Sequence, residues 1–341
     1  MTAFATSTHA SSAHASSSHG RKNLNSARTA AILLLALILS LVGISCTTIS
    51  KEVSTRGIFD QFEQTPQVIM RVEGMFLRDF VDSLNDDTIQ ALMMRINTQA
   101  SEQQIRKPIN RSRIDSTLSR THVAAIGLTW KDRKTVSFEA TLAGNFARIP
   151  TALSFALDSS WKRIPGGYAA KTGALHVRDP QAGKLHVSSF PFQMAGAGTG
   201  AGARVLAEQS GLLASDASFD MYIDAKSAVV SKLPILDGIT LPFDGIRVIA
   251  MRDGTSPTVG AADAVYLARI RIQMKDEQTA RTFRPIMKLV WALLSAQISS
   301  MGLPIPPETG IEQKGSSFET QTFPVQARDI VEILASALNL V

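Results

Sequence analysis

Apolar and polar residues alternate in several short stretches of the chain, which is the pattern of half-buried β-strands. Residues 136–142 place Val, Phe, Ala and Leu at every second position, and a similar stretch begins at Val265 and Leu267. In residues 75–84 the apolar side chains instead recur every three or four positions, with Phe76 and Phe80 on one face. That spacing predicts an amphipathic helix. The pattern therefore indicates a protein of mixed strands and helices.

The order of these stretches suggests that one unit occurs twice. Residues 70–74 (MRVEG) precede a helical stretch, and residues 221–225 (MYIDA) do the same 151 positions later. Two further strands, a helix and a final hairpin, which takes the place of the last strand of the unit, follow in each half. This order, β-α-β-β-α-β, is that of a ferredoxin-like unit. We predict an α+β fold with an internal duplication, in which the first repeat is 66–194 and the second 218–341. A Gly-rich linker with a short helix, 195–217, joins them. The alternative is a single mixed α/β domain whose similar segments are coincidental.

One apolar run is longer than the others and contains no charge. It spans Ala30–Ser45, follows a basic stretch at residues 21–28, and ends at Cys46, the only cysteine of the chain. A basic start, an apolar centre and small residues before a cut site describe a secretory signal. With Gly-Ile-Ser-Cys at residues 43–46, the segment resembles the signal peptide of bacterial lipoproteins, and the spirochaete type in particular. The resemblance implies that Cys46 is lipidated, and that this lipid anchors the protein to a membrane of the cell envelope.

The domain boundaries at the N-terminus follow from this interpretation. Residues 1–45 are expected to be a signal peptide and residues 46–65 a lipidated tether. The Ser/Ala/His-rich leader before the apolar run is long for a signal peptide, so we hypothesise that translation starts downstream of Met1. An uncleaved membrane anchor is the alternative, although the run of 16 residues is shorter than the roughly 20 that span a bilayer core.

Composition narrows the classes of partner. Without the three basic residues of the signal, the chain keeps 32 Lys and Arg against 29 Asp and Glu, a net charge of +3. So small an excess gives no support to nucleic-acid binding, and no nucleic-acid partner is expected. Because Cys46 is assigned to lipid, no disulfide or cysteine metal site is expected either. The apolar content of 45% is that of a folded protein with a sizeable core.

No set of residues predicts an enzyme, a metal site or a cofactor. Gly196, Gly198 and Ala201 fit the spacing of a dinucleotide loop, but a Gly/Ala run is more often a linker or loop. Ser159 and Lys162 match the spacing of one box of penicillin-recognising enzymes by chance, because the other boxes are misplaced. His176 and His186 flank a predicted turn without a third metal ligand. We therefore expect a protein that is not an enzyme, with no cofactor.

Two helical stretches could contact lipid. Residues 283–298 are apolar around most of the helix, and residues 328–341 are amphipathic. Burial in the core explains both stretches, and a surface that holds an acyl chain or enters the membrane is the other interpretation. Two hypotheses follow: a non-enzymatic binding or scaffold protein that contacts another envelope protein, or a lipid-binding or membrane-inserting protein. Under the second, the candidate lipid contacts are Phe283, Met287, Val290, Trp291, Leu294, Ile298, Ile330, Leu334 and Leu338.

Overall fold

The computed structural model describes residues 49–84, 111–130, 136–171, 175–192, 200–227, 242–254, 264–300, 305–306 and 309–330. All of them belong to one unit of the chain, Thr48–Val341. Its described helices are α2 (Lys51–Thr55), α3 (Gly74–Ser83), α6 (Arg111–Arg120), α7 (Arg148–Leu157), α8 (Ala201–Gln209) and α9 (Glu277–Ser300).

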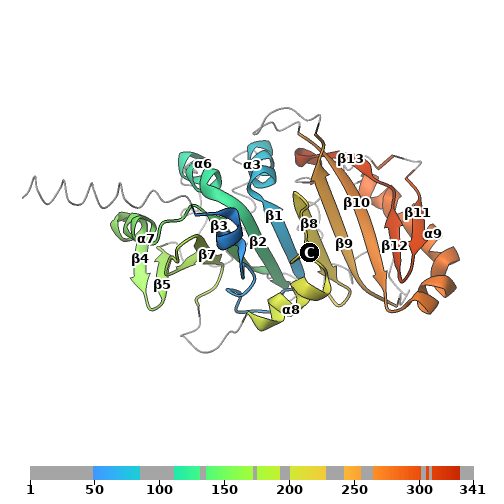
Figure 1. The fold of residues 1–341 in the computed structure, drawn as a ribbon, viewed down its shortest axis with the longest axis horizontal. Coiled ribbons are helices and arrows are strands. Elements are labelled where there is room, and N and C mark those ends of the chain that lie inside the picture. The colour runs from blue at the N-terminus through green and yellow to red at the C-terminus, as the bar shows by residue number, and fades with distance from the viewer. Residues whose placement is uncertain are drawn as a thin grey trace, which may run out of the picture. The chain divides into compact units, whose positions relative to one another are not determined.

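The strands of this unit form one antiparallel sheet of 13 strands (Figure 1). The strands are β1 (Val68–Glu73), β2 (Thr121–Trp130), β3 (Val136–Gly144), β4 (Trp161–Ile164), β5 (Gly167–Ala170), β6 (His176–Arg178), β7 (Lys184–Ser188), β8 (Phe219–Asp224), β9 (Phe243–Arg252), β10 (Val265–Met274), β11 (Ile311–Lys314), β12 (Ser317–Thr320) and β13 (Phe323–Gln326). Their order across the sheet is β11-β12-β10-β9-β8-β1-β2-β3-β7-β6-β5-β4, and β13 pairs with β10.

The prediction of two ferredoxin-like repeats is wrong. In a ferredoxin-like unit the two strands that precede helices lie parallel at the centre of their own sheet. Here β1 is flanked by β2 and β8, and both pairings are antiparallel. β1 and β8, which begin the two predicted repeats, lie side by side, with Met70 opposite Met221. One continuous sheet therefore runs through both predicted halves. Many of the strands were predicted from the sequence, but β4 and β13 were not. The partner of a strand depends on contacts between distant residues, which local patterns do not carry.

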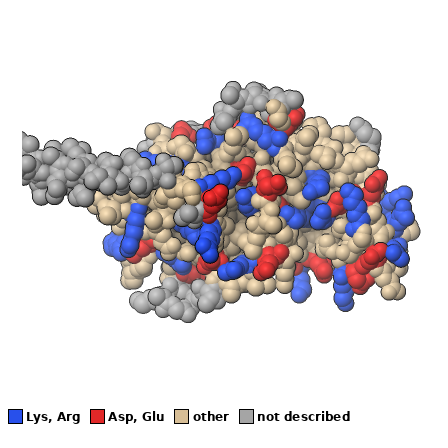
Figure 2. Space-filling view, viewed as in Figure 1, with Lys and Arg blue, Asp and Glu red and all other residues tan. Residues whose placement is uncertain are grey.

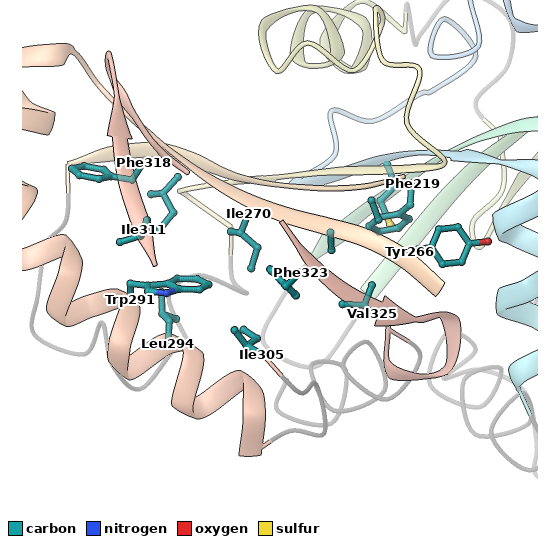
Figure 3. Close-up of a cluster of buried hydrophobic side chains, with 14 of the residues drawn as sticks. Phe219, Tyr266, Ile270, Trp291, Leu294, Ile305, Ile311, Phe318, Phe323 and Val325 are labelled. Carbon is teal, nitrogen blue, oxygen red and sulfur yellow. The ribbon is translucent and has the colours of Figure 1, made fainter. Parts of the chain in front are cut away.

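The two faces of the sheet carry different side chains. In β1, Val68, Met70 and Val72 enter a large apolar core, whereas Ile69 enters a second cluster. Because successive side chains of a strand point to opposite faces, the two clusters lie on opposite sides of the sheet. Helices α3 and α9 contribute to the large core (Figure 3), and α8 contributes to the second cluster together with residues 58–62.

Helix α3 is fixed to the large core by both apolar and polar contacts. The ring of Phe76 lies 4.9 Å from that of Phe219 and 4.7 Å from that of Tyr266. The Tyr266 hydroxyl donates to Oδ2 of the buried Asp79 at 2.5 Å, and Nη1 of Arg252 lies 3.3 Å from the same oxygen. Burial and the Asp79 carboxylate both raise the pKa of Tyr266, so this hydroxyl remains a donor at neutral pH.

Among the described residues, the helices are all too short or too polar to cross a bilayer.

Candidate functional site

The first described residues follow the predicted lipidation site closely. Cys46 itself lies outside the described residues, and Ile49 is the first of them. The backbone N–H of Ile49 donates to Oδ1 of Asn145 at 3.1 Å. Helix α2 then lies against β2 and β3. The segment predicted as a tether is therefore packed on the sheet from Ile49 onward.

The residues after α2 form a strap, residues 56–66, on the same sheet face as α8. Phe59 and Phe62 of the strap are buried in the second cluster, together with Ile69 and Val123 of the sheet. A Cβ atom on Gly127 of β2 would lie 2.5 Å from the ring of Phe62. Only glycine leaves room for this ring, so the strand and the strap are shaped to each other.

The Gly-rich segment before α8 has a packing role. A Cβ atom on Gly200 would lie 2.4 Å from the carbonyl oxygen of Asp60, and one on Gly202 would lie 1.9 Å from Oγ1 of Thr65. Both glycines thus let the start of α8 approach the strap closely. Gly196 and Gly198 of the same run lie outside the described residues.

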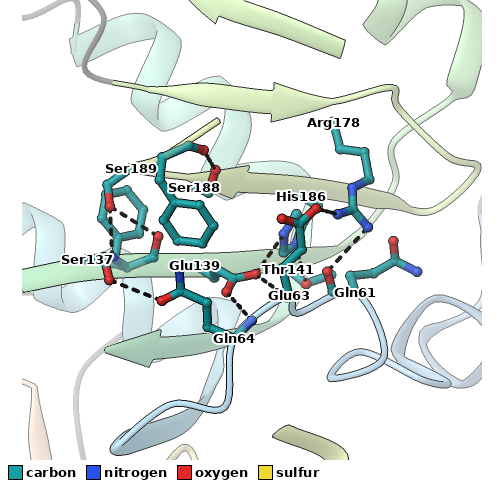
Figure 4. Close-up of polar contacts among 12 residues, drawn as sticks. Gln61, Glu63, Gln64, Ser137, Glu139, Thr141, Arg178, His186, Ser188 and Ser189 are labelled. Carbon is teal, nitrogen blue, oxygen red and sulfur yellow. Dashed lines mark hydrogen bonds and ion pairs between the residues drawn. The ribbon is translucent and has the colours of Figure 1, made fainter. Parts of the chain in front are cut away.

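Polar side chains of the sheet bind the strap through hydrogen bonds and ion pairs (Figure 4). The buried carboxylate of Glu139 accepts from the backbone N–H groups of Glu63 and Gln64, at 2.7 and 2.9 Å. Arg178 of β6 forms an ion pair with Glu63. The ammonium of Lys184 donates to the carbonyl oxygens of the first two strap residues. Three strands therefore contribute groups to one binding surface for the strap.

His186 is a fully buried member of the same group of polar residues beneath the strap. Its Nδ1 lies 2.9 Å from Oγ1 of Thr141, and its Nε2 lies 3.4 Å from Oε2 of Glu139. The order Thr141, His186, Glu139 resembles a nucleophile, base and acid. Thr141 is fully buried between strands, so a substrate has no access to its hydroxyl. This geometry serves packing and does not amount to an exposed catalytic site.

Burial lowers the pKa of His186, and the charge of Arg178 lowers it further, against the opposing effect of Glu139 and Glu63. A lowered pKa means that the folded state binds a proton less readily than the unfolded chain does. We therefore expect the free energy of unfolding to be constant above about pH 6.5 and to fall as the pH drops below that value. Urea titrations at pH 7.5 and 5.5 would measure this slope. It should flatten in His186→Gln, and an unchanged slope in that variant would assign the pH dependence to other groups.

The two histidines considered for metal binding do not form a site. His176 lies opposite Ser188 in the β6–β7 pairing, and His186 contacts Thr141 of β3. Burial, with a smaller contribution from Lys162, lowers the pKa of His176. Within the described ranges, no group of three His, Cys, Asp or Glu residues could hold a metal ion.

Of the predicted lipid-contact residues, some are buried in the large core and others pack against its edge. Met287, Val290, Trp291 and Leu294 are buried in the large core, and Phe283 packs against it. The indole N–H of Trp291 donates to the carbonyl oxygen of Thr309 at 2.7 Å. Ile330 also packs against this core. The side chain of Ile298 and all of Leu334 and Leu338 lie outside the described residues. Contact of these residues with lipid stays a prediction, and for the four buried side chains it requires the core to open.

Other apolar side chains of the helices are exposed. On α7 they are Ile149, Leu153 and Leu157, with 71%, 47% and 82% of their surface accessible. A spacing of four places all three on one face of the helix. The opposite face is fixed by Phe155, whose ring packs edge-on against Trp161 at 4.9 Å. Sequence analysis missed this surface, although the spacing of the three residues was visible.

Helix α9 has a similar outer face, formed by Ile286, Leu289 and Leu293. This face adjoins the stripe of four buried residues, so apolar side chains cover much of the circumference of α9, as its sequence indicated. Charged side chains are more evenly distributed: on the face in Figure 2, basic and acidic residues drawn in colour are interleaved.

Comparisons with known proteins give no family and only remote structural neighbours. No protein-family model matches the chain, and no curated protein is similar to it in sequence. Among solved structures, three crystal forms of TP0453, a protein of the spirochaete Treponema, resemble it. Form I is 13% identical with a TM-score of 0.49, and the match covers 83% of this chain and 97% of that one. Form III is 12% identical with a TM-score of 0.47, covering 82% and 97%. Form IV is 12% identical with a TM-score of 0.43, covering 82% and 99%.

At TM-scores below 0.5 these similarities carry no argument about fold or function. The function has to be argued from the side chains described above.

Proposed function

We propose that the protein is a lipid-anchored protein of the cell envelope, with a non-enzymatic binding or scaffold role at the membrane surface. Lipidated Cys46 is its anchor, and the exposed face of α7 (Ile149, Leu153 and Leu157) rests on the bilayer. The observation that carries this proposal is the hydrogen bond between Ile49 and Asn145, because it joins the start of the folded unit to the start of α7.

Chain length supports the placement of α7. Cys46 is three positions before Ile49, and an extended chain spans at most about 3.6 Å for each position. The lipid attachment point therefore lies within about 11 Å of Ile49. Asn145, which binds Ile49, is three residues before the first residue of α7. A lipid at Cys46 thus brings the start of α7 close to the membrane surface.

The chemistry of this end of the unit suits a bilayer. One apolar side chain of this size gains about 1.5–3 kcal/mol when it leaves water, so three of them add to an acyl anchor without replacing it. Arg148 and Lys162 lie on or beside α7 with exposed side chains, where they favour anionic headgroups. Figure 1 shows α7, β4 and β5 together at one end of the sheet.

A free thiol introduced into the lipidated protein tests the proposal. Because Cys46 is the only natural cysteine, a cysteine in Leu153→Cys can be labelled selectively with an environment-sensitive fluorophore. In liposomes, we expect a blue-shifted emission that doxyl-labelled lipids quench. Leu289→Cys on α9 is the matched control and should stay aqueous. Flotation with liposomes, compared with Cys46→Ala, reports the anchor separately.

The possible results separate the hypotheses. A protein that floats with liposomes but has an aqueous label at residue 153 would retain the anchor and refute contact through α7. Such a result would favour an envelope protein as the partner of this face. Failure of the wild-type chain to carry lipid on Cys46 would refute the anchor itself.

Lipid handling by α9 is the second candidate function. It is favoured by the exposed Ile286, Leu289 and Leu293, all of which lie in the stretch 283–298 predicted to contact lipid. A quenched label at residue 289, with an aqueous one at residue 153, would support this candidate over the first.

A further inference from the structure

A cleft of about 660 Å³ lies beside the end of α8. Residues 206 and 208–211 form one wall, and side chains of β8, β9 and β10 form the other walls and the floor. Its volume is in the range of small-ligand sites. The cleft is on the sheet face opposite the large core and takes no part in the membrane contact proposed above.

Two arginines meet in this cleft. Arg247 of β9 and Arg271 of β10 are directly opposite each other in the strand pairing, an arrangement that places like charges on neighbouring strands at a cost in stability. Each has one carboxylate partner: Arg247 binds Asp220 at 2.5 and 2.9 Å, and Arg271 binds Glu319. In the part of the chain that the structure describes, Nε of Arg271 is buried without a hydrogen-bond partner.

Carboxylates line another part of the cleft. The Tyr222 hydroxyl donates to the backbone carbonyl of Asp244 at 3.0 Å. Burial raises the pKa of Tyr222 to about 12, and the nearby charges of Asp224 and Asp244 add to this effect. Asp224 already accepts from the backbone N–H of Lys226. The exposed carboxylate of Asp244 has no partner among the described residues, so it is available to a positively charged group.

We propose that this cleft binds a small zwitterion, such as an amino acid or a dipeptide. The ligand's carboxylate would accept from Arg247 and Arg271, since guanidinium groups match carboxylates in geometry and charge. Its ammonium would lie toward Asp224 and Asp244. A simple anion has only half of this complementarity, because it would also face the carboxylates.

Calorimetric titration of the full lipidated chain in non-ionic micelles tests this proposal. Alanylalanine is the probe, and its N-acetyl and C-terminal amide forms each lack one of the two charges. We expect saturable binding of alanylalanine, and binding at least about tenfold weaker for each blocked form, since charge-assisted hydrogen bonds are stronger than neutral ones.

Substitutions at the arginine end and at the carboxylate end of the cleft test each half of the proposed site. Arg271→Gln should weaken alanylalanine binding about tenfold or more, whereas Arg269→Gln, on the same face of β10 outside the cleft, should leave it unchanged. Because loss of Arg271 also removes the ion pair with Glu319, Asp244→Asn provides a second variant without that defect. It should weaken binding of alanylalanine while leaving that of the N-acetyl form unchanged. Absence of saturable binding, equal binding of the blocked forms, or equal effects at residues 269 and 271 would overturn the proposal, and none of these results bears on the membrane anchor.

Discussion

Glu139→Ala is expected to lower the free energy of unfolding by about 3–5 kcal/mol, the usual cost of removing one partner from a buried charged cluster. The substitution deprives the backbone N–H groups of Glu63 and Gln64 of their acceptor. Each buried donor left without a partner costs about 1–3 kcal/mol. It also removes the carboxylate beside His186. Urea unfolding followed by circular dichroism measures the change.

The loss should be concentrated in the strap. Regions that open locally become accessible to proteases before the whole protein unfolds, so limited trypsin digestion should cut Glu139→Ala faster after Arg56. Glu312→Ala, at an exposed position of β11, is the matched control and should behave like the wild type. Glu139→Gln keeps the volume of the side chain but replaces one acceptor by a donor, and it should also be destabilised. A Glu139→Ala protein within about 1 kcal/mol of the wild type, with unchanged cleavage at Arg56, would show that the cluster does not hold the strap.

The burial of the strap explains why the sequence did not predict the polar cluster around Glu139. In residues 136–142 the alternation of polar and apolar residues was interpreted as a strand with one face in water. The polar face, with Glu139 and Thr141, is instead buried under residues 56–66, whereas the alternating apolar side chains of β3 are only half-buried. A signal was present in the predicted tether, where Phe59 and Phe62 are too apolar for a segment exposed to solvent. Their burial partners come from distant strands, which no local pattern identifies.

The same reasoning explains which parts of the fold were predictable. The alternating stretches at residues 136–142 and 265–271 lie in β3 and β10, and the amphipathic stretch 75–84 corresponds to α3. Periodicity records which side chains are buried, and it succeeds for such elements. The partner of a strand is a different property. β1 pairs with β8 across about 150 residues, and the predicted repeats failed at this pairing.

Trp291→Ala is the substitution that separates a core helix from a lipid-binding one. Trp291 is 5% exposed and its indole N–H donates to the carbonyl oxygen of Thr309. Truncation of a buried aromatic residue leaves a cavity and costs about 3–5 kcal/mol, and here it also leaves the Thr309 carbonyl without this donor. We expect a loss of this size in urea unfolding, with or without lipid. Leu289→Ala, at a position on the same helix that is 63% exposed, should change the free energy of unfolding by less than about 0.5 kcal/mol.

The lipid dependence of Trp291→Ala is the decisive part of this experiment. If Trp291 belongs to the core, as its contacts indicate, liposomes change neither the stability loss nor the accessibility of the helix. If the helix instead opens to hold an acyl chain, the wild type should be stabilised by added fatty acid, because a ligand that binds the folded state raises its stability. The variant should then lose that stabilisation, while Leu289→Ala should keep it. If fatty acid stabilises the wild type and Leu289→Ala but not Trp291→Ala, Trp291 belongs to a lipid-binding site. Lipid handling by α9 would then be the main function.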